Sequence, residues 1–202
     1  MTTAAPQIDP AIESQAVFRA VMDAMARPGE IRPLTAAIVA PPPLTRAAAA
    51  IAKALADYET PVWLDARLAA APEVARWLAF ETGAPVTDDP RRAAFALIAD
   101  ATHLPPLENF SLGTDDYPDR STTLVVQVDR FGSGETIALA GPGIAGRRAF
   151  SAAPLPRDFA LRLAANRSLF PRGVDLVLAS GHAVAALPRS VTANPGSDGR
   201  CM

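Results

Sequence analysis

The chain has 202 residues, half of them hydrophobic, which is enough for one domain with a substantial core. Its formal net charge is −2, so electrostatics alone does not favour a nucleic-acid partner. No apolar stretch approaches the ~20 residues of a membrane-spanning helix. The first residues lack the basic start and apolar core of a signal peptide, and the one cysteine, Cys201, excludes an internal disulfide. We therefore expect a cytoplasmic protein.

Predicted helices and strands alternate in the first half of the chain. Asp9 and Pro10 are typical of a helix start, because aspartate caps the first turn and proline fits its first position. Apolar residues then recur at helical spacing and form one stripe that includes Val17, Phe18, Val21, Met22 and Met25. Further along we expect a short strand over 30–34, a helix over 45–58, a strand over 61–64, a helix over 72–82 ended by Gly83, and a buried strand over 93–99.

The middle of the chain is expected to form a β-hairpin. Two apolar runs, 122–128 and 137–140, flank a turn at 132–134 that contains two glycines. The second run stops at 141–143, where glycine and proline exclude further strand. The long irregular segment before the hairpin is a candidate functional loop because of its length.

The last third is expected to contain a helix over 157–166 and a second hairpin, made of the apolar runs 174–179 and 183–187. Residues 192–202 are polar and contain glycine, so we expect a disordered tail after a single domain that spans 1–191. Alternating elements followed by hairpins predict an α/β domain with a mixed sheet covered by helices.

Few residues could carry independent chemistry. His103 lies in a loop, His182 in a predicted turn, and Cys201 in the expected tail. A zinc site recruits three or four ligands, so this set is too small for zinc, although carboxylates could still hold magnesium. Eighteen arginines stand against the single lysine, Lys53. Either codon bias or bidentate binding of phosphate and carboxylate by arginine accounts for that excess.

A glycine motif, Gly141 to Gly146, matches the G-x-G-x-x-G pattern of dinucleotide-binding proteins. That fingerprint needs a helix after the third glycine, whereas Pro154 and Pro156 leave too little room for one. We interpret the motif as a turn that ends a strand. A weaker alternative is an anion site formed by exposed glycine amides with the neighbouring Arg147 and Arg148.

Three aspartates around Tyr117 and Pro118 form the densest acidic cluster. Such clusters are usually solvated loops, but this one could also contact a metal–phosphate group or a partner protein. In a hairpin the two outer ends lie side by side, so the predicted hairpin brings the acidic loop next to the glycine–arginine turn. The predicted contact site for a partner or anion consists of Asp115, Asp116, Asp119, Gly141, Gly143, Arg147 and Arg148.

Several segments, taken together and in order, resemble the PhnH family, a subunit of the bacterial carbon–phosphorus lyase system that degrades phosphonates. The resemblance covers about 15–190 and rests on the segments 18–29, 55–64, 110–144, 170–176 and 187–189. None of these segments carries a catalytic signature of its own, so the order of the set makes the match specific.

The resemblance implies an architecture like that of pyridoxal-phosphate-dependent transferases, without the cofactor. A pyridoxal enzyme needs a lysine for its Schiff base, and Lys53 lies in an alanine-rich predicted helix with no motif around it. The resemblance also implies other carbon–phosphorus lyase subunits (PhnG, PhnI, PhnJ and PhnL) as partners, and a homodimer when the chain is alone. With them the family supports the exchange of the adenine of ATP for a phosphonate, giving ribose 1-phosphonate 5-triphosphate.

Two other functions remain open from the residues alone. One is a self-sufficient small-molecule transferase that uses carboxylates of the 108–119 loop. The other is a nucleotide-binding module built on the glycine motif. Activity of the purified chain alone distinguishes the first from a supporting subunit, and titration with nucleotide tests the second.

Overall fold

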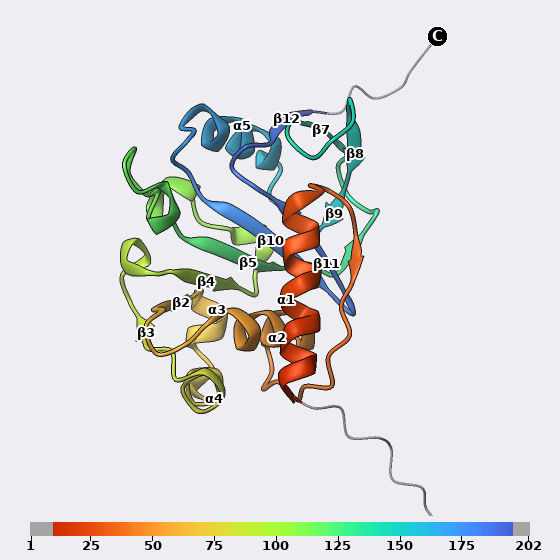
Figure 1. Cartoon of the computed structure of the whole chain (residues 1–202). Coiled ribbons are helices and arrows are strands. Elements are labelled where there is room, and N and C mark those ends of the chain that lie inside the picture. The colour runs from red at the N-terminus through yellow and green to blue at the C-terminus, as the bar shows by residue number, and fades with distance from the viewer. Residues whose placement is uncertain (1–9, 196–202) are drawn as a thin grey trace, which may run out of the picture.

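A mixed sheet of seven strands forms the centre of the computed structural model, which describes residues 10–195 (Figure 1). From one edge to the other, its strands are β1 (Arg32–Pro33), β11 (Ala183–Leu187), β10 (Asp175–Ser180), β5 (Thr123–Gln127), β4 (Phe95–Ile98), β2 (Val62–Leu64) and β3 (Val86–Thr87). Neighbouring strands from β10 to β3 are parallel, whereas β11 is antiparallel to both β10 and β1. This arrangement confirms the predicted α/β class and mixed sheet.

Helices and two small sheets cover the faces of the central sheet. The elements on the first face are α1 (Pro10–Ala26), α2 (Arg46–Leu55), α3 (Ala66–Ala69) and α4 (Pro72–Thr82). The second face carries α5 (Phe159–Ser168), a sheet of β12 (Thr192–Pro195), β7 (Ile137–Ala140) and β8 (Arg148–Phe150), and a pair of β6 (Arg130–Phe131) with β9 (Ala152–Ala153). A separate hydrophobic core lies on each face of the central sheet. Successive residues of β10 contribute to different cores, because Val177 packs into the core on the first face and Leu176 into the core on the second.

The local sequence explains where the helices begin and end. Thr45 caps α2 by accepting a hydrogen bond from the amide of Ala48 at 3.4 Å, and buried alanines let this helix lie close to the sheet. Pro72 occupies the first turn of α4, and Gly83 ends it with a φ of 73°. The helix expected over 72–82 is therefore confirmed, whereas the one expected over 45–58 ends at Leu55, after which Ala56 is extended. Asp9, the expected cap of α1, lies outside the described residues.

The predicted hairpin between 122–128 and 137–140 is wrong. Strand β5 lies in the central sheet between the parallel strands β4 and β10, whereas β7 pairs with β12 and β8. Residues Leu124, Val125 and Val126 are all buried, which is typical of a strand covered on both faces, whereas β7 alternates buried and partly exposed positions.

The second predicted hairpin is confirmed, since β10 and β11 pair antiparallel around a turn in which Gly181 has a φ of 53°. The predicted tail begins too early. Residues expected to be disordered from 192 onward include β12, in which Ala193 is buried against the second core. A strand forms there because its backbone pairs with β7. No local pattern in the sequence predicts this pairing. Residues 196–202 lie outside the described part.

Candidate functional site

A largely inaccessible ion pair joins two of the segments on which the family resemblance rests. The Asp175 carboxylate at the start of β10 accepts the backbone N–H of Arg189 at 2.8 Å and its Nε–H at 3.1 Å, and it also pairs with Nη2. Each side chain is only 14% exposed. The same guanidinium donates through Nη1 to the Pro118 carbonyl at 2.5 Å and through Nη2 to the Ser121 hydroxyl. Arg189 thus fixes the loop that leads into β5.

The acidic loop is ordered by its own hydrogen bonds as well. The amide of Thr114 donates to the Tyr117 carbonyl at 3.1 Å, and the Thr114 hydroxyl accepts the Tyr117 amide at 3.0 Å. Gly113 has a φ of 72°, and a side chain there would meet the Pro118 carbonyl oxygen at 2.8 Å, so the turn requires glycine. The loop therefore presents its exposed residues in a fixed arrangement.

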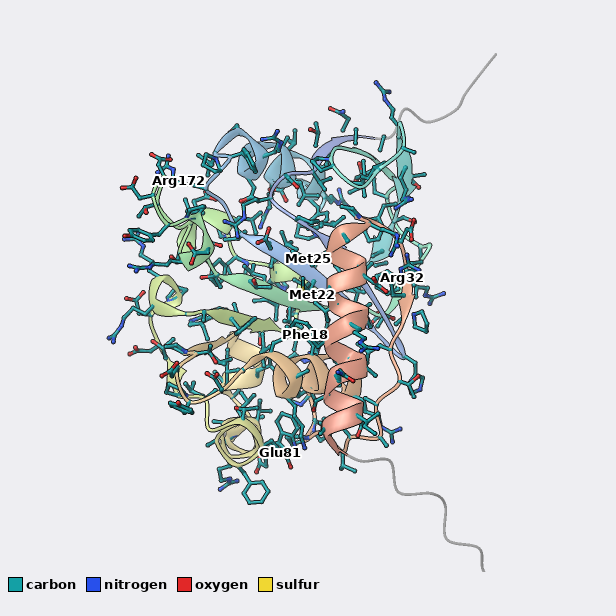
Figure 2. All side chains as sticks on the ribbon, in the orientation of Figure 1. Phe18, Met22, Met25, Arg32, Glu81 and Arg172 are labelled. Atoms are coloured by element: carbon teal, nitrogen blue, oxygen red, sulfur yellow. The ribbon has the colours of Figure 1, made fainter. Side chains whose placement is uncertain are left out.

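The three aspartates of this loop are exposed, and they differ in their contacts. Asp115 Oδ1 lies 3.4 Å from Arg172 Nε, an ion pair without a hydrogen bond (Arg172 is labelled in Figure 2). Asp116 and Asp119 are exposed and form no ion pair with any residue in 10–195. Within that part of the chain no group of three histidine, cysteine or acidic side chains could hold a metal ion. The loop is thus a surface suited to contacts.

Next to this loop, arginines line an open hollow of about 230 Å³ at the amino ends of β4 and β5. Arg91 and Arg92 follow the cap of a short 3-10 helix, η1 (Pro90–Arg92), and both side chains are exposed without an ion pair among the described residues. Arg120 stacks on Tyr117, with its guanidinium carbon 4.1 Å from the ring centroid. Three guanidinium groups beside Asp119 leave an excess of positive charge, so the hollow suits an anionic group. These arginines were not predicted as site residues from the sequence, although two adjacent arginines are a visible signal.

The glycine–arginine turn lies elsewhere, against the end of α1. A side chain at Gly143 would come within 2.2 Å of the Ala26 carbonyl oxygen, and its φ is 79°. Arg148 donates to the Pro28 carbonyl at 2.8 Å and to Glu30 Oε1 at 2.7 Å. The guanidinium of Arg148 therefore fastens this turn to the segment between α1 and β1.

The predicted site is thus corrected: its two halves do not meet, because the hairpin that would have joined them is absent. Figure 1 shows the loop before β5 and the β7–β8 turn on opposite sides of the domain. A side chain at Gly141 would meet the Ser190 carbonyl oxygen at 3.0 Å, and Arg147 is exposed without an ion pair in the described chain. Strand β8 follows Gly146, so the motif lacks the helix that a dinucleotide fingerprint requires.

One acid–base pair lies at the other end of the parallel strands from the arginine hollow, beyond the carboxyl end of β4. His103 Nδ1 is 2.8 Å from Asp100 Oδ2, and this hydrogen bond is the main cause that lowers the pKa of Asp100 below its ordinary value. The His103 side chain is 81% exposed. Nearby Asp65 is buried, but backbone amides of Leu68, Ala99 and Asp100 satisfy its carboxylate. These contacts account for an ordered loop after β4.

No helix within 10–195 has the length and the apolar character to span a bilayer. This finding agrees with the hydropathy of the sequence.

Known proteins match nearly the whole chain. The model of the family described as "Bacterial phosphonate metabolism protein (PhnH)" matches residues 7–194. A relative from Rhizobium meliloti (strain 1021), named alpha-D-ribose 1-methylphosphonate 5-triphosphate synthase subunit PhnH, is 45% identical over 182 residues, which is 90% of this chain and 90% of that protein. The putative C-P lyase subunit protein HtxG of Stutzerimonas stutzeri is 37% identical over 83 residues, 41% of this chain and 43% of that protein. The chain therefore belongs to the PhnH family of bacterial phosphonate metabolism proteins.

Proposed function

We propose that this chain is a subunit of ribose 1-methylphosphonate 5-triphosphate synthase in the carbon–phosphorus lyase system. With its partner subunits it supports transfer of a phosphonate to the ribose C1 of ATP with release of adenine. The observation that carries the proposal is the 45% identity over 90% of both chains to a subunit with that name. The scarcity of catalytic groups supports a contributing subunit over a self-sufficient transferase.

The contact surface that we propose is the acidic loop together with the arginine hollow beside it. Arg189 holds the loop rigidly, so its exposed side chains can be presented to a partner without a large loss of conformational freedom. The hollow offers guanidinium groups without carboxylate partners in the described chain, which suits either an acidic partner surface or an anionic substrate group. The aspartates beside it add a complementary contact for basic groups.

The test replaces Arg91 and Arg92 together by alanine, with Arg67→Ala and Arg130→Ala together as the control. The control pair has the same charge, is exposed, and forms no ion pair within 10–195. We expect co-purification with the other subunits to weaken about 30-fold, as for loss of a binding hot spot worth about 2 kcal/mol. Intact assembly with slower adenine release would instead assign the hollow to substrate.

Unchanged assembly and unchanged adenine release would remove the hollow from the site. The purified chain alone should release no adenine from ATP and methylphosphonate. Adenine release by the isolated chain would contradict the subunit proposal and favour a self-sufficient enzyme.

We further propose an architecture related to pyridoxal-phosphate-dependent transferases, with no pyridoxal phosphate bound. Support comes from the central mixed sheet with helices on both faces and from the surroundings of Lys53. Its ammonium pairs with Glu81 of α4 in a partly buried contact, so the one lysine of the chain already has a partner on a neighbouring helix (Glu81 is labelled in Figure 2). An aldimine absorption band in the purified protein that disappears in Lys53→Ala would contradict this proposal, and we expect no such band.

As partners we propose PhnG, PhnI, PhnJ and PhnL, because the family resemblance implies them, and a homodimer when the chain is alone. We also propose a cytoplasmic location. The family's whole assembly uses ATP and phosphonate as substrates, and we propose no cofactor held by this chain.

A further inference from the structure

A pocket of about 240 Å³ opens into the second hydrophobic core, between β8, β9 and the start of α5 (Figure 1). Ile137, Phe150 and Phe159 line it and are buried members of that core. Leu155, in the connection from β9 to α5, borders the pocket as well. Side chains beside an open hollow lack neighbours on that side, so an apolar group that enters gains dispersion contacts and leaves water.

The size of the pocket limits what can enter it. At the ~30 Å³ that a water molecule occupies in the liquid, the space holds roughly eight non-hydrogen atoms. Pockets for drug-sized ligands are larger, at about 300–1,000 Å³. This pocket therefore suits one branched aliphatic group with its head group at the rim, and it is too small to enclose a nucleotide.

Two opposite charges border the pocket without touching each other. Arg157 comes from the connection before α5, and Glu135 comes from the turn before β7. Both side chains are exposed, and neither forms an ion pair with any residue in 10–195. The neighbouring carboxylate of Asp158 pairs with Arg162 at 2.9 Å and leaves Arg157 without a partner. The rim can thus receive a ligand that carries one charge of each sign.

The backbone on both sides of the rim is held in place. Gly134 has a φ of 86°, and a side chain there would meet the Ala152 carbonyl oxygen at 2.9 Å, so the turn that carries Glu135 lies against β9. On the other side, the amide of Phe159 donates to the Pro156 carbonyl at 3.0 Å and closes the turn that contains Arg157. A fixed backbone lowers the entropy cost of binding at this rim.

We infer that this pocket binds a free apolar α-amino acid of the size of leucine. The apolar side chain of the ligand enters between Phe150 and Phe159, its carboxylate pairs with Arg157, and its ammonium pairs with Glu135. An α-amino acid has both charges next to its side chain, whereas a residue inside a peptide has neither. The pocket shares no residue with the arginine hollow, so the inference is independent of the proposed subunit function.

The experiment titrates the full chain with leucine and with three probes that each lack one of its groups, and calorimetry measures the binding. Isocaproate lacks the ammonium, isoamylamine lacks the carboxylate, and alanine lacks the large side chain. We expect leucine to bind saturably at one site, and each probe to bind at least about 10-fold more weakly, as for loss of one charged or apolar contact.

Two substitutions assign the charges to the ligand. Arg157→Gln and Glu135→Gln should each weaken leucine binding at least about 10-fold. Glu135→Gln should not weaken the binding of isocaproate, because that probe has no ammonium and the variant removes a repelling carboxylate. Thermal unfolding should stay unchanged, since both side chains are exposed. Matched controls are Arg67→Gln and Glu108→Gln, which are exposed without an ion pair in the described chain and should bind leucine normally.

Three results would overturn the inference. The first is the absence of saturable leucine binding up to about 10 mM. Leucine binding that is unchanged in both rim variants would exclude this pocket as the site. Isocaproate that binds as tightly as leucine would exclude the amino-acid class. None of these results bears on the proposed subunit function, which co-purification with the other subunits tests.

Discussion

Replacing Arg189 by alanine should lower the free energy of unfolding by about 3 kcal/mol, because it leaves the mostly inaccessible Asp175 carboxylate without its charged partner. Each side chain of the pair is 14% exposed, so solvent can compensate only part of the loss. The substitution also removes the donors that the Pro118 carbonyl and the Ser121 hydroxyl now use. The loop before β5 should therefore loosen together with the start of β10.

Chemical denaturation of the isolated chain measures this effect, with Arg27→Ala as the control. Arg27 forms an exposed ion pair with Asp23 in which the two side chains are 50% and 60% exposed, and such pairs contribute about 0–1 kcal/mol. Hydrogen exchange should show faster exchange in the acidic loop of the Arg189 variant. A loss of stability equal to that of the control would mean that the Asp175–Arg189 pair is replaceable by water and does not organise the loop.

Local chemistry made most of the helices predictable. The cap at Thr45, the proline at the start of α4 and the glycine at position 83 each act within one turn of the chain, so the residues themselves define the element. The β10–β11 hairpin was predictable for the same reason, since its turn needs only Ser180 to His182. The family and its proposed function came from the order of whole segments, not from any such local rule.

Strand pairing was predictable only in part, because a strand's neighbours are set by contacts far along the chain. The run before Gly132 and the run after Gly134 are close in sequence, yet they lie in different sheets. Three consecutive buried apolar residues in β5 were the available signal for a central parallel strand. The strand β12 had no such signal, since its residues pair with β7 across a separation of more than fifty positions.

The candidate site could not be assembled from spacing for the same reason. Arg148 and Glu30 are separated by 118 positions, and Arg189 and Pro118 by 71. Their contacts form only after the sheet has brought distant segments together. The sequence identified the acidic loop correctly as an exposed surface, but it paired that loop with the wrong neighbour, and the arginine hollow went unnoticed.

The adjacent residues Arg147 and Arg148 should differ in their effect on stability, although the sequence placed both in one predicted site. Arg148→Ala should lower the free energy of unfolding by about 1–3 kcal/mol, because the Pro28 carbonyl loses its donor and Glu30 keeps only Arg32 as a partner. Arg147→Ala should change it by less than about 0.5 kcal/mol, since that side chain is exposed and has no ion pair in the described chain. The neighbouring residue is therefore a matched control for the loss of one guanidinium group.

Thermal and chemical unfolding of the two single variants provide the measurement, together with their co-purification with partner subunits. A stability loss confined to Arg148→Ala would identify this arginine as the residue that fastens the β7–β8 turn to the end of α1. Equal stability of both variants, with weaker assembly for either, would indicate that the β7–β8 turn contacts a partner subunit. Because a side chain at Gly143 would come within 2.2 Å of the Ala26 carbonyl oxygen, the turn lies directly against the end of α1, and its loosening should be transmitted to that helix.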